Sequence, residues 1–277
     1  MAQSVSLELR RTKAAPRLRG LADNYRLLGA ALLVLILAVW ETVTRLGLID
    51  PLILPAPTAI AAAALKVFVQ TREIYPHLWV SFQEGLLGFG LAVVVGVPLG
   101  LVLGRSRLFR ALFEPYVMAL YSTPQVAFFP LLIIALGIGL WSKVALVFFG
   151  AVFSILINTQ AGVINTDRRM IEMARSFTAS ELTIFRKVIL PASVPFIIAG
   201  MRLGLGRALI MVFVAELFSA TEGIGYMIVR AGALFDTPKL FVGVLVMTLA
   251  GVLISEGMKR LEHRLVPWLS IREEETR

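Results

Sequence analysis

A charged segment between two hydrophobic stretches, Arg168-Arg-Met-Ile-Glu-Met-Ala-Arg-Ser-Phe-Thr-Ala-Ser-Glu-Leu-Thr-Ile-Phe-Arg-Lys-Val-Ile-Leu-Pro191, determines how we interpret the whole chain. Its first apolar residues recur at helical spacing, at Met170, Met173, Ala174 and Phe177. This spacing predicts a short amphipathic helix that ends near Phe177. A second helix is predicted from Leu182 to Ile189, and Pro191 and Pro195 are expected to break the chain after it. Such a helix pair, joined rigidly to the next hydrophobic stretch, could transmit a push from a soluble partner.

The segment resembles the cytoplasmic coupling loop of the permeases of ABC importers. The pattern of that family is Glu-Ala-Ala, three residues, Gly, nine residues and then Ile-x-Leu-Pro. The residues in register with it are Glu172, Ala174, Val188, Leu190 and Pro191. The chain departs from the pattern at Met173 and at Thr178, which stands where the family has glycine.

The departure at Thr178 bears on the bend between the two helices. Glycine at a bend suggests a left-handed residue, which a β-branched side chain resists. However, Thr178-Ala-Ser-Glu181 matches a capping box, with Phe177 and Leu182 as the flanking hydrophobic pair. We therefore predict that Thr178 is the N-cap of the second helix, in an extended conformation that threonine tolerates.

The resemblance implies that this loop contacts a separate ATPase. The expected coupling residues are Glu172, Ala174, Arg175, Phe177, Thr178, Ala179, Glu181 and Pro191. The alternative is an ordinary pair of helices at the membrane surface.

The composition indicates an all-α polytopic membrane protein. The chain is 58% hydrophobic with a mean hydropathy of +0.82. It has no cysteine and two histidines far apart in sequence, which excludes thiolate metal sites and leaves no metal site to propose. Six spans of suitable length are predicted at residues 27–46, 78–104, 113–136, 143–162, 194–218 and 239–258. An outer surface helix is expected at Ala59–Gln70.

The charge distribution predicts the orientation of these spans. The net charge is +9, and most Lys and Arg residues fall on the side of the termini and of the charged segment. The positive-inside rule then places both termini and this segment in the cytoplasm, and gives no reason to propose a nucleic-acid partner. We divide the chain into a basic cytoplasmic tail (1–26), a permease domain (27–264) with a coupling loop (163–193), and a cytoplasmic C-terminal tail (265–277).

Two further patterns concern helix packing and the translocation path. The second predicted span carries small residues at every fourth position, at Gly88, Ala92, Gly96, Gly100 and Gly104. This stripe favours close approach of another helix, in static packing or at a moving contact. The third span is interrupted by prolines, and broken helices persist in a membrane where they meet protein or a water-filled path. We therefore predict that the path is lined by Ser122, Thr123, Pro124 and Gln125.

The third span also extends the resemblance. Pro124-x-x-Ala-x-x-Pro-Leu131, followed by Gly137-Ile-Gly-x-x-x-Lys143, is similar to the nitrate/sulfonate/taurine-type branch of these permeases. The likeness covers nearly the whole chain, from the first span to Arg264. It implies six helices of type I importer architecture.

Three ionisable residues lie in the fifth predicted span, where charges are costly and usually face protein or water. Arg207 lies near mid-span beside Gly200, Gly204 and Ala208, and is either a path residue or part of a structural ion pair. We predict that it approaches the third span of its own or the partner subunit near Ser122–Gln125. Arg202 is nearer the cytoplasmic end and could reach lipid headgroups. Glu216 lies near the outer end, where a neighbouring helix or a second subunit could pair with it, and it is a further candidate for the lining of the path.

The chain lacks a phosphate-binding Gly-x-x-x-x-Gly-Lys-Ser/Thr loop and any recognisable catalytic cluster, so we expect neither enzyme activity nor a cofactor. The resemblance implies an ATP-driven importer for a small anionic solute such as a sulfonate, taurine or nitrate. Its expected partners are a second permease copy, two ATP-binding subunits, an external solute-binding protein and the lipid bilayer of the inner membrane. The alternatives are a secondary carrier, a membrane scaffold, or an importer of the same type that carries a vitamin precursor.

Overall fold

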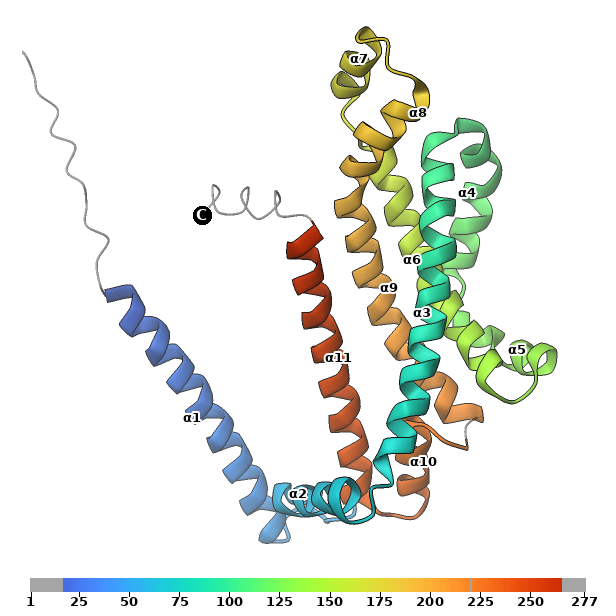
Figure 1. The fold of residues 1–277 in the computed structure, drawn as a ribbon. Coiled ribbons are helices and arrows are strands. Elements are labelled where there is room, and N and C mark those ends of the chain that lie inside the picture. The colour runs from blue at the N-terminus through green and yellow to red at the C-terminus, as the bar shows by residue number, and fades with distance from the viewer. Residues whose placement is uncertain (1–16, 220, 266–277) are drawn as a thin grey trace, which may run out of the picture. The chain divides into compact units, whose positions relative to one another are not determined.

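The computed structural model describes residues 17–219 and 221–265, and the described residues form helices and connecting turns without a strand. The long helices are α1 (Arg17–Arg45), α3 (Ile74–Arg105), α6 (Leu140–Ile164), α9 (Leu190–Ser219) and α11 (Thr237–Leu265). The shorter elements are α2 (Pro57–Leu65), η1 (Lys66–Gln70), α4 (Arg107–Ser122), η2 (Gln125–Phe128), α5 (Phe129–Leu136), α7 (Arg168–Ser176), α8 (Glu181–Ile184), η3 (Phe185–Ile189) and α10 (Ile224–Ala233). Figure 1 shows their arrangement.

Five of the six predicted spans are single helices of sufficient length and apolarity to cross a membrane. The third is different, because α4 and the η2–α5 segment meet at a 90° bend and together cover the predicted range (Figure 1). Helix α1 begins at Arg17, so the last part of the predicted basic tail, from Arg17 to Arg26, is helical. The predicted tail before Arg17 and the predicted C-terminal tail after Leu265 lie outside the described residues.

The chain divides into two compact units, Met1–Ala59 and Ile60–Arg277. Within the first unit, the Glu41 carboxylate accepts hydrogen bonds from the backbone amide (3.0 Å) and hydroxyl (2.7 Å) of Thr58. It also pairs with Arg45 at 2.5 Å. These bonds fix the connector after α1 to the C-terminal end of the same helix.

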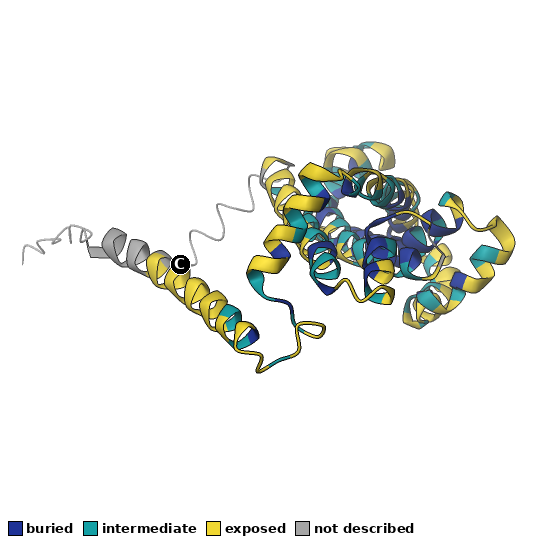
Figure 2. Ribbon diagram, turned by 90° about the horizontal axis from the view of Figure 1, so that it is seen from below, coloured by how far each residue is buried: buried dark blue, intermediate teal, exposed yellow. Residues whose placement is uncertain are grey.

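Helix α6 is the centre of the second unit, because 67% of the residues in its most apolar stretch are buried. The small-residue stripe of α3 lies against α6. Figure 2 shows that the buried residues gather inside this bundle of helices. A Cβ on Gly100 would lie 2.6 Å from the Leu156 carbonyl oxygen, and one on Gly204 of α9 would lie 3.1 Å from that of Ala151. The approach of α3 at Gly100 leaves no room for a side chain and that of α9 at Gly204 is tight, which confirms that the small residues of α3 pack closely against another helix.

The helix that leaves the charged segment continues without interruption into the fifth span. The prediction that Pro191 and Pro195 break the chain is wrong, because α8, η3 and α9 form one continuous helical path. The residues before Pro191 form a π-helical turn in which the Leu190 amide bonds to the Phe185 carbonyl. This wider turn accommodates the proline ring, as π-bulges do within α-helices.

Candidate coupling loop and translocation path

The inner face of α7 packs on the end of the helix bundle. Asp167 caps the helix by accepting the Arg169 amide at 2.9 Å. Ile171 and Ala174 then pack against a small buried cluster formed by Val163, Ile184 and Ile189. The predicted amphipathic helix is present and ends at Ser176, with its position fixed by apolar contacts to α6, α8 and η3.

The outer face of α7 carries exposed apolar side chains among its charged residues. Met170 is 51% exposed, Met173 60% and Phe177 78%, and Leu182 at the start of the second helix is 59% exposed. The apolar spacing that predicted the helix therefore marks mainly an outward surface. Exposed apolar patches of this kind mark sites of contact with another protein or with the membrane surface.

The bend between α7 and α8 has Thr178 in the left-handed region, at φ +57°. The Thr178 amide bonds to the Arg175 carbonyl at 2.8 Å and the Ala179 amide bonds to the Ala174 carbonyl at 3.2 Å. This pair of bonds is a Schellman motif, in which the left-handed position is usually glycine. The N-cap of α8 is instead Ser180, whose hydroxyl accepts the Thr183 amide at 3.3 Å. The prediction that Thr178 caps the second helix is wrong, and threonine occupies the strained position itself.

An ion-pair cluster joins the coupling loop to α3. Glu181, the first residue of α8, pairs with Arg175 of α7 at 2.9 Å and with Arg105 at the C-terminal end of α3. All three side chains are at least 42% exposed, so each pair contributes little stability. The cluster links α7, α8 and the C-terminal end of α3. Glu172 is exposed, and no ion pair to it occurs within the described residues.

The break between α4 and α5 is stabilised by the side chain of Gln125. Pro124 supplies no amide hydrogen, so carbonyls of the last turn of α4 lose their helical partners. The Gln125 amide nitrogen donates to the Tyr121 carbonyl at 3.2 Å and to that of Leu120 at 3.5 Å, and its side chain is buried. Thr123 donates its hydroxyl to the Ala119 carbonyl at 2.9 Å. The predicted path residues therefore include the groups that hold the broken helix, while Ser122 and Pro124 are exposed.

Arg207 of α9 lies beside this break. Its Nη2 donates to the Tyr121 hydroxyl at 2.9 Å, and its guanidinium carbon lies 4.5 Å from the centroid of the Tyr121 ring. Tyr121 immediately precedes Ser122, so Arg207 approaches the third span at the predicted place. Our prediction did not name Tyr121, although a tyrosine one residue before Ser-Thr-Pro was a visible signal.

Glu216 is buried at the outer end of α9 and is bonded within its own chain. Its carboxylate accepts the Gly225 amide at 2.7 Å and the hydroxyl of Ser81 on α3. The Ser81 oxygen accepts the Ile224 amide at 3.0 Å, and His77 Nδ1 accepts the Gly223 amide at 3.1 Å. These side chains satisfy the free amides at the N-terminus of α10, where a negative charge is favourable. The predicted neighbouring-helix pairing of Glu216 thus occurs with α3 and α10, and its position favours a structural role over path lining.

A buried ion pair between α3 and α6 was missed by our sequence reasoning. Lys143 Nζ lies 2.5 Å from Glu84 Oε1, and the two side chains are 7% and 0% exposed. We noted Lys143 only as part of a motif and did not consider Glu84. An acidic residue within the 78–104 span was a signal that could have found the pair. Arg202, expected to reach headgroups, pairs with Glu262 of α11 instead.

The chain matches a known family over much of its length. Residues 96–269 match the model of the binding-protein-dependent transport system inner membrane component. The putative aliphatic sulfonates transport permease protein SsuC of Bacillus subtilis is 33% identical over 240 residues, 87% of each chain. The taurine transport system permease protein TauC of Escherichia coli is 32% identical over 240 residues, 85% of this chain and 87% of the relative.

The fold is also found among solved structures. A chain of the MetNI methionine ABC transporter in an inward-facing conformation aligns with a TM-score of 0.60 and 20% identity, covering 68% of this chain and 93% of that one. This likeness concerns the fold alone. Together with the family match, it confirms the predicted type of membrane architecture and sets aside the secondary-carrier and scaffold alternatives. The chain therefore belongs to the family of inner-membrane components of binding-protein-dependent transport systems, the permease subunits of ABC importers.

Proposed function

We propose that this permease forms the translocation path of an importer for a small anionic solute of the aliphatic sulfonate type. It works with a second copy of itself, two ATP-binding subunits and an external solute-binding protein, and its termini and coupling loop (residues 163–193) face the cytoplasm of the inner membrane. The names of the relatives SsuC and TauC support the solute class. The positive-inside bias supports the orientation.

One observation carries the coupling mechanism. The helical path from Glu181 to Phe218 is continuous, and it bears the coupling end at Leu182 and the path residue Arg207. At 1.5 Å per residue, these two positions are about 38 Å apart along the helix. A push on the exposed apolar patch of α7 and α8 therefore displaces Arg207 relative to the break at Pro124. Such rigid-body movement is how closure of an ATPase dimer rocks a bundle between inward and outward states.

Arg207 supports an anionic solute. Within the described residues its side-chain partner is the neutral Tyr121, so its charge is not matched by a carboxylate. A guanidinium held beside a broken helix can bind a sulfonate through two parallel hydrogen bonds. The Tyr121 hydroxyl holds the guanidinium in place and still leaves nitrogen donors available.

The test uses proteoliposomes that contain the permease together with its ATPase and its solute-binding protein. We expect ATP-dependent uptake of a labelled short-chain aliphatic sulfonate, and competition by unlabelled sulfonates but not by a neutral analogue. Glu172→Lys should abolish this uptake without loss of the inserted permease, because it reverses an exposed charge at the ATPase contact. Normal uptake in this variant would remove the coupling role of Glu172. Uptake of a neutral solute with no competition by sulfonates would overturn the solute class.

A further inference from the structure

A second ionisable residue without an opposite charge lies on the broken third span. Glu114 of α4 is partly exposed, and its Oε1 accepts a hydrogen bond at 3.3 Å from the side-chain amide of Gln160, which is 4% exposed on α6. The ion pairs among the described residues do not include Glu114. Arg110, one turn earlier, donates to the carbonyls of Leu103 and Gly104 instead. An acidic side chain within a span is costly and marks a functional contact.

Glu114 shares a face of α4 with Tyr121, the partner of Arg207. The two residues are seven positions apart, so they differ by about 20° around the helix axis. Tyr121 packs against the hydrophobic core around α6. Leu112 and Tyr116, on the opposite face of α4, are 54% and 69% exposed. Glu114 therefore belongs to the face of α4 that is directed at the helix bundle.

Two opposite charges thus lie near each other on one side of the broken span. The offset from Glu114 to Tyr121 along α4 is about 10 Å. Long side chains on a helix lean toward its N-terminus, so the Tyr121 hydroxyl and the guanidinium bonded to it are shifted toward Glu114. Yet each charge is held by a neutral partner, Arg207 by Tyr121 and Glu114 by Gln160. These partners orient the two charges without neutralising them and leave both available to a ligand.

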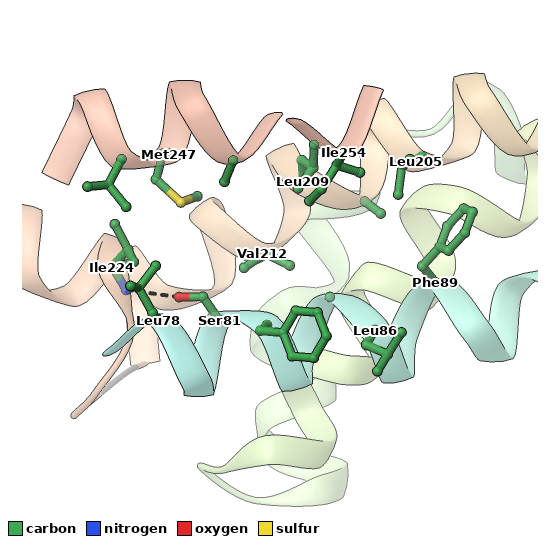
Figure 3. A pocket seen from close by; sticks show the side chains of 15 residues that line it. Leu78, Ser81, Leu86, Phe89, Leu205, Leu209, Val212, Ile224, Met247 and Ile254 are labelled. Carbon is green, nitrogen blue, oxygen red and sulfur yellow. Dashed lines mark hydrogen bonds between the residues drawn. The ribbon is translucent and has the colours of Figure 1, made fainter. Parts of the chain in front are cut away.

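The pocket in Figure 3 offers no such pair of charges. It lies between α3, α9 and α11, and neither Glu114 nor Arg207 belongs to its lining. Ser81 is the polar side chain among its described lining residues, and its hydroxyl is already bonded to the Ile224 amide at 3.0 Å. A charged solute would lose its water there without gaining a partner.

The pair of charges selects a class of solute. This inference rests on the proposed function, in which the acidic group of the solute binds Arg207. A solute with only a negative charge is repelled by the Glu114 carboxylate, and this repulsion is strong where water is scarce. A solute that also carries an ammonium group gains a charge-assisted hydrogen bond from the same carboxylate. We propose that Glu114 is a specificity-determining residue, which binds the ammonium group of a short zwitterionic sulfonate while Arg207 binds its sulfonate.

The test measures binding of solutes to the purified permease–ATPase complex in nanodiscs. The solute-binding protein is left out, because it would select the solute before the permease does. The probes are radiolabelled 2-aminoethanesulfonate and ethanesulfonate, which differ only in the amino group. We expect the aminosulfonate to bind about tenfold more tightly, which is the effect of one hydrogen bond to a charged group.

Variants of Glu114 separate its charge from its place in the structure. Glu114→Gln keeps an acceptor for Gln160 and removes the charge, so it should abolish the preference for the aminosulfonate. Glu114→Asp keeps the charge on a shorter side chain and should retain part of the preference. The matched control is Glu256→Gln on α11, which removes a carboxylate paired with the exposed Lys259 and Arg260 and should leave the preference unchanged.

The possible outcomes distinguish this inference from the proposed function. Equal affinities of the natural chain for the two probes would overturn the role of Glu114 and leave the sulfonate importer intact. A rise of both affinities in Glu114→Gln would also overturn it, because Glu114 would then be an internal counter-charge for Arg207. Binding of neither probe to the natural chain would contradict the proposed function itself.

Discussion

Lys143 and Glu84 form an ion pair of 2.5 Å that is enclosed between α6 and α3. The Glu84 Oε2 atom is buried without a hydrogen-bond partner in the described residues, so Lys143 provides the whole compensation for this carboxylate. Removal of one partner from such a pair leaves an uncompensated charge, which costs about 3–5 kcal/mol.

We therefore predict that Lys143→Met strongly lowers the thermal unfolding midpoint of the purified permease in detergent. The double variant Lys143→Met/Glu84→Gln should recover most of the loss, because no buried charge remains. Lys239→Met, which breaks the more exposed pair with Glu73, is the matched control and should have a small effect. Equal midpoints for the single and the double variant would show that the pair does not act as a unit.

Thr178 provides the second prediction. A non-glycine residue in the left-handed region costs about 1–2 kcal/mol, and the Schellman motif does not use the threonine hydroxyl. Thr178→Gly should therefore slow hydrogen exchange at the Thr178 and Ala179 amides by about tenfold. Ser180→Ala should weaken the start of α8 instead, since Ser180 is the actual cap. Faster exchange in the glycine variant would contradict the strained conformation.

Arg207 and Tyr121 provide the third prediction. Arg207→Lys keeps the charge but loses the two-pronged geometry, so uptake should fall while insertion and folding persist. Tyr121→Phe keeps the ring beneath the guanidinium and removes only the hydroxyl, so it should lower uptake less than Arg207→Lys. Arg202→Lys on the same helix is the control, because its pair with Glu262 tolerates an ammonium. Full uptake with Arg207→Lys would leave Arg207 a structural role only.

The pair between Glu73 and Lys239 predicts a pH dependence outside the spans. The hydrogen bond from Lys239, at 2.9 Å, holds the pKa of the Glu73 carboxyl below its usual value of 4.5. A depressed pKa adds stability above the unfolded value, and this contribution is lost as the pH falls through the folded value. The thermal midpoint should thus decrease below pH 4.5, and less steeply in Glu73→Gln. Because Glu73 is 37% exposed, we expect a small difference, and identical slopes would show that the pair is screened.

The sequence predicted the elements better than their junctions. Hydropathy and periodicity predicted the spans and the amphipathic helix α7. The small residues of α3 predicted its close packing against another helix. The bend at Thr178 could not be predicted, because a capping box and a Schellman motif both fit the same residues. In the structure the Schellman motif forms, and Ala174 and Ala179 pack against the buried cluster of Val163, Ile184 and Ile189. The continuous helix through Pro191 depends on a π-turn, which has no clear sequence signal.

The partners of the ionisable residues could not be predicted from the sequence either. A charge within a span is visible in the sequence, but its partner is set by the packing of distant helices. Lys143 and Glu84 are 59 residues apart, and Ser81 and Glu216 are 135 residues apart. The approach of Arg207 to the third span was predictable, because a broken helix persists where it meets protein, but its partner, the Tyr121 hydroxyl, was not.

The central claim is that the outer face of α7 docks a separate ATPase on the cytoplasmic side. The natural chain has no cysteine, so a single Met173→Cys variant can carry a photoreactive cross-linker at one exposed position. Leu234→Cys, 69% exposed beside α10 at the opposite end of the second unit (Figure 1), is the matched control. We predict that irradiation of the assembled transporter cross-links Met173→Cys to the ATPase and leaves Leu234→Cys unlinked to it. An ATPase cross-link at Leu234→Cys, or none at Met173→Cys, would contradict the account.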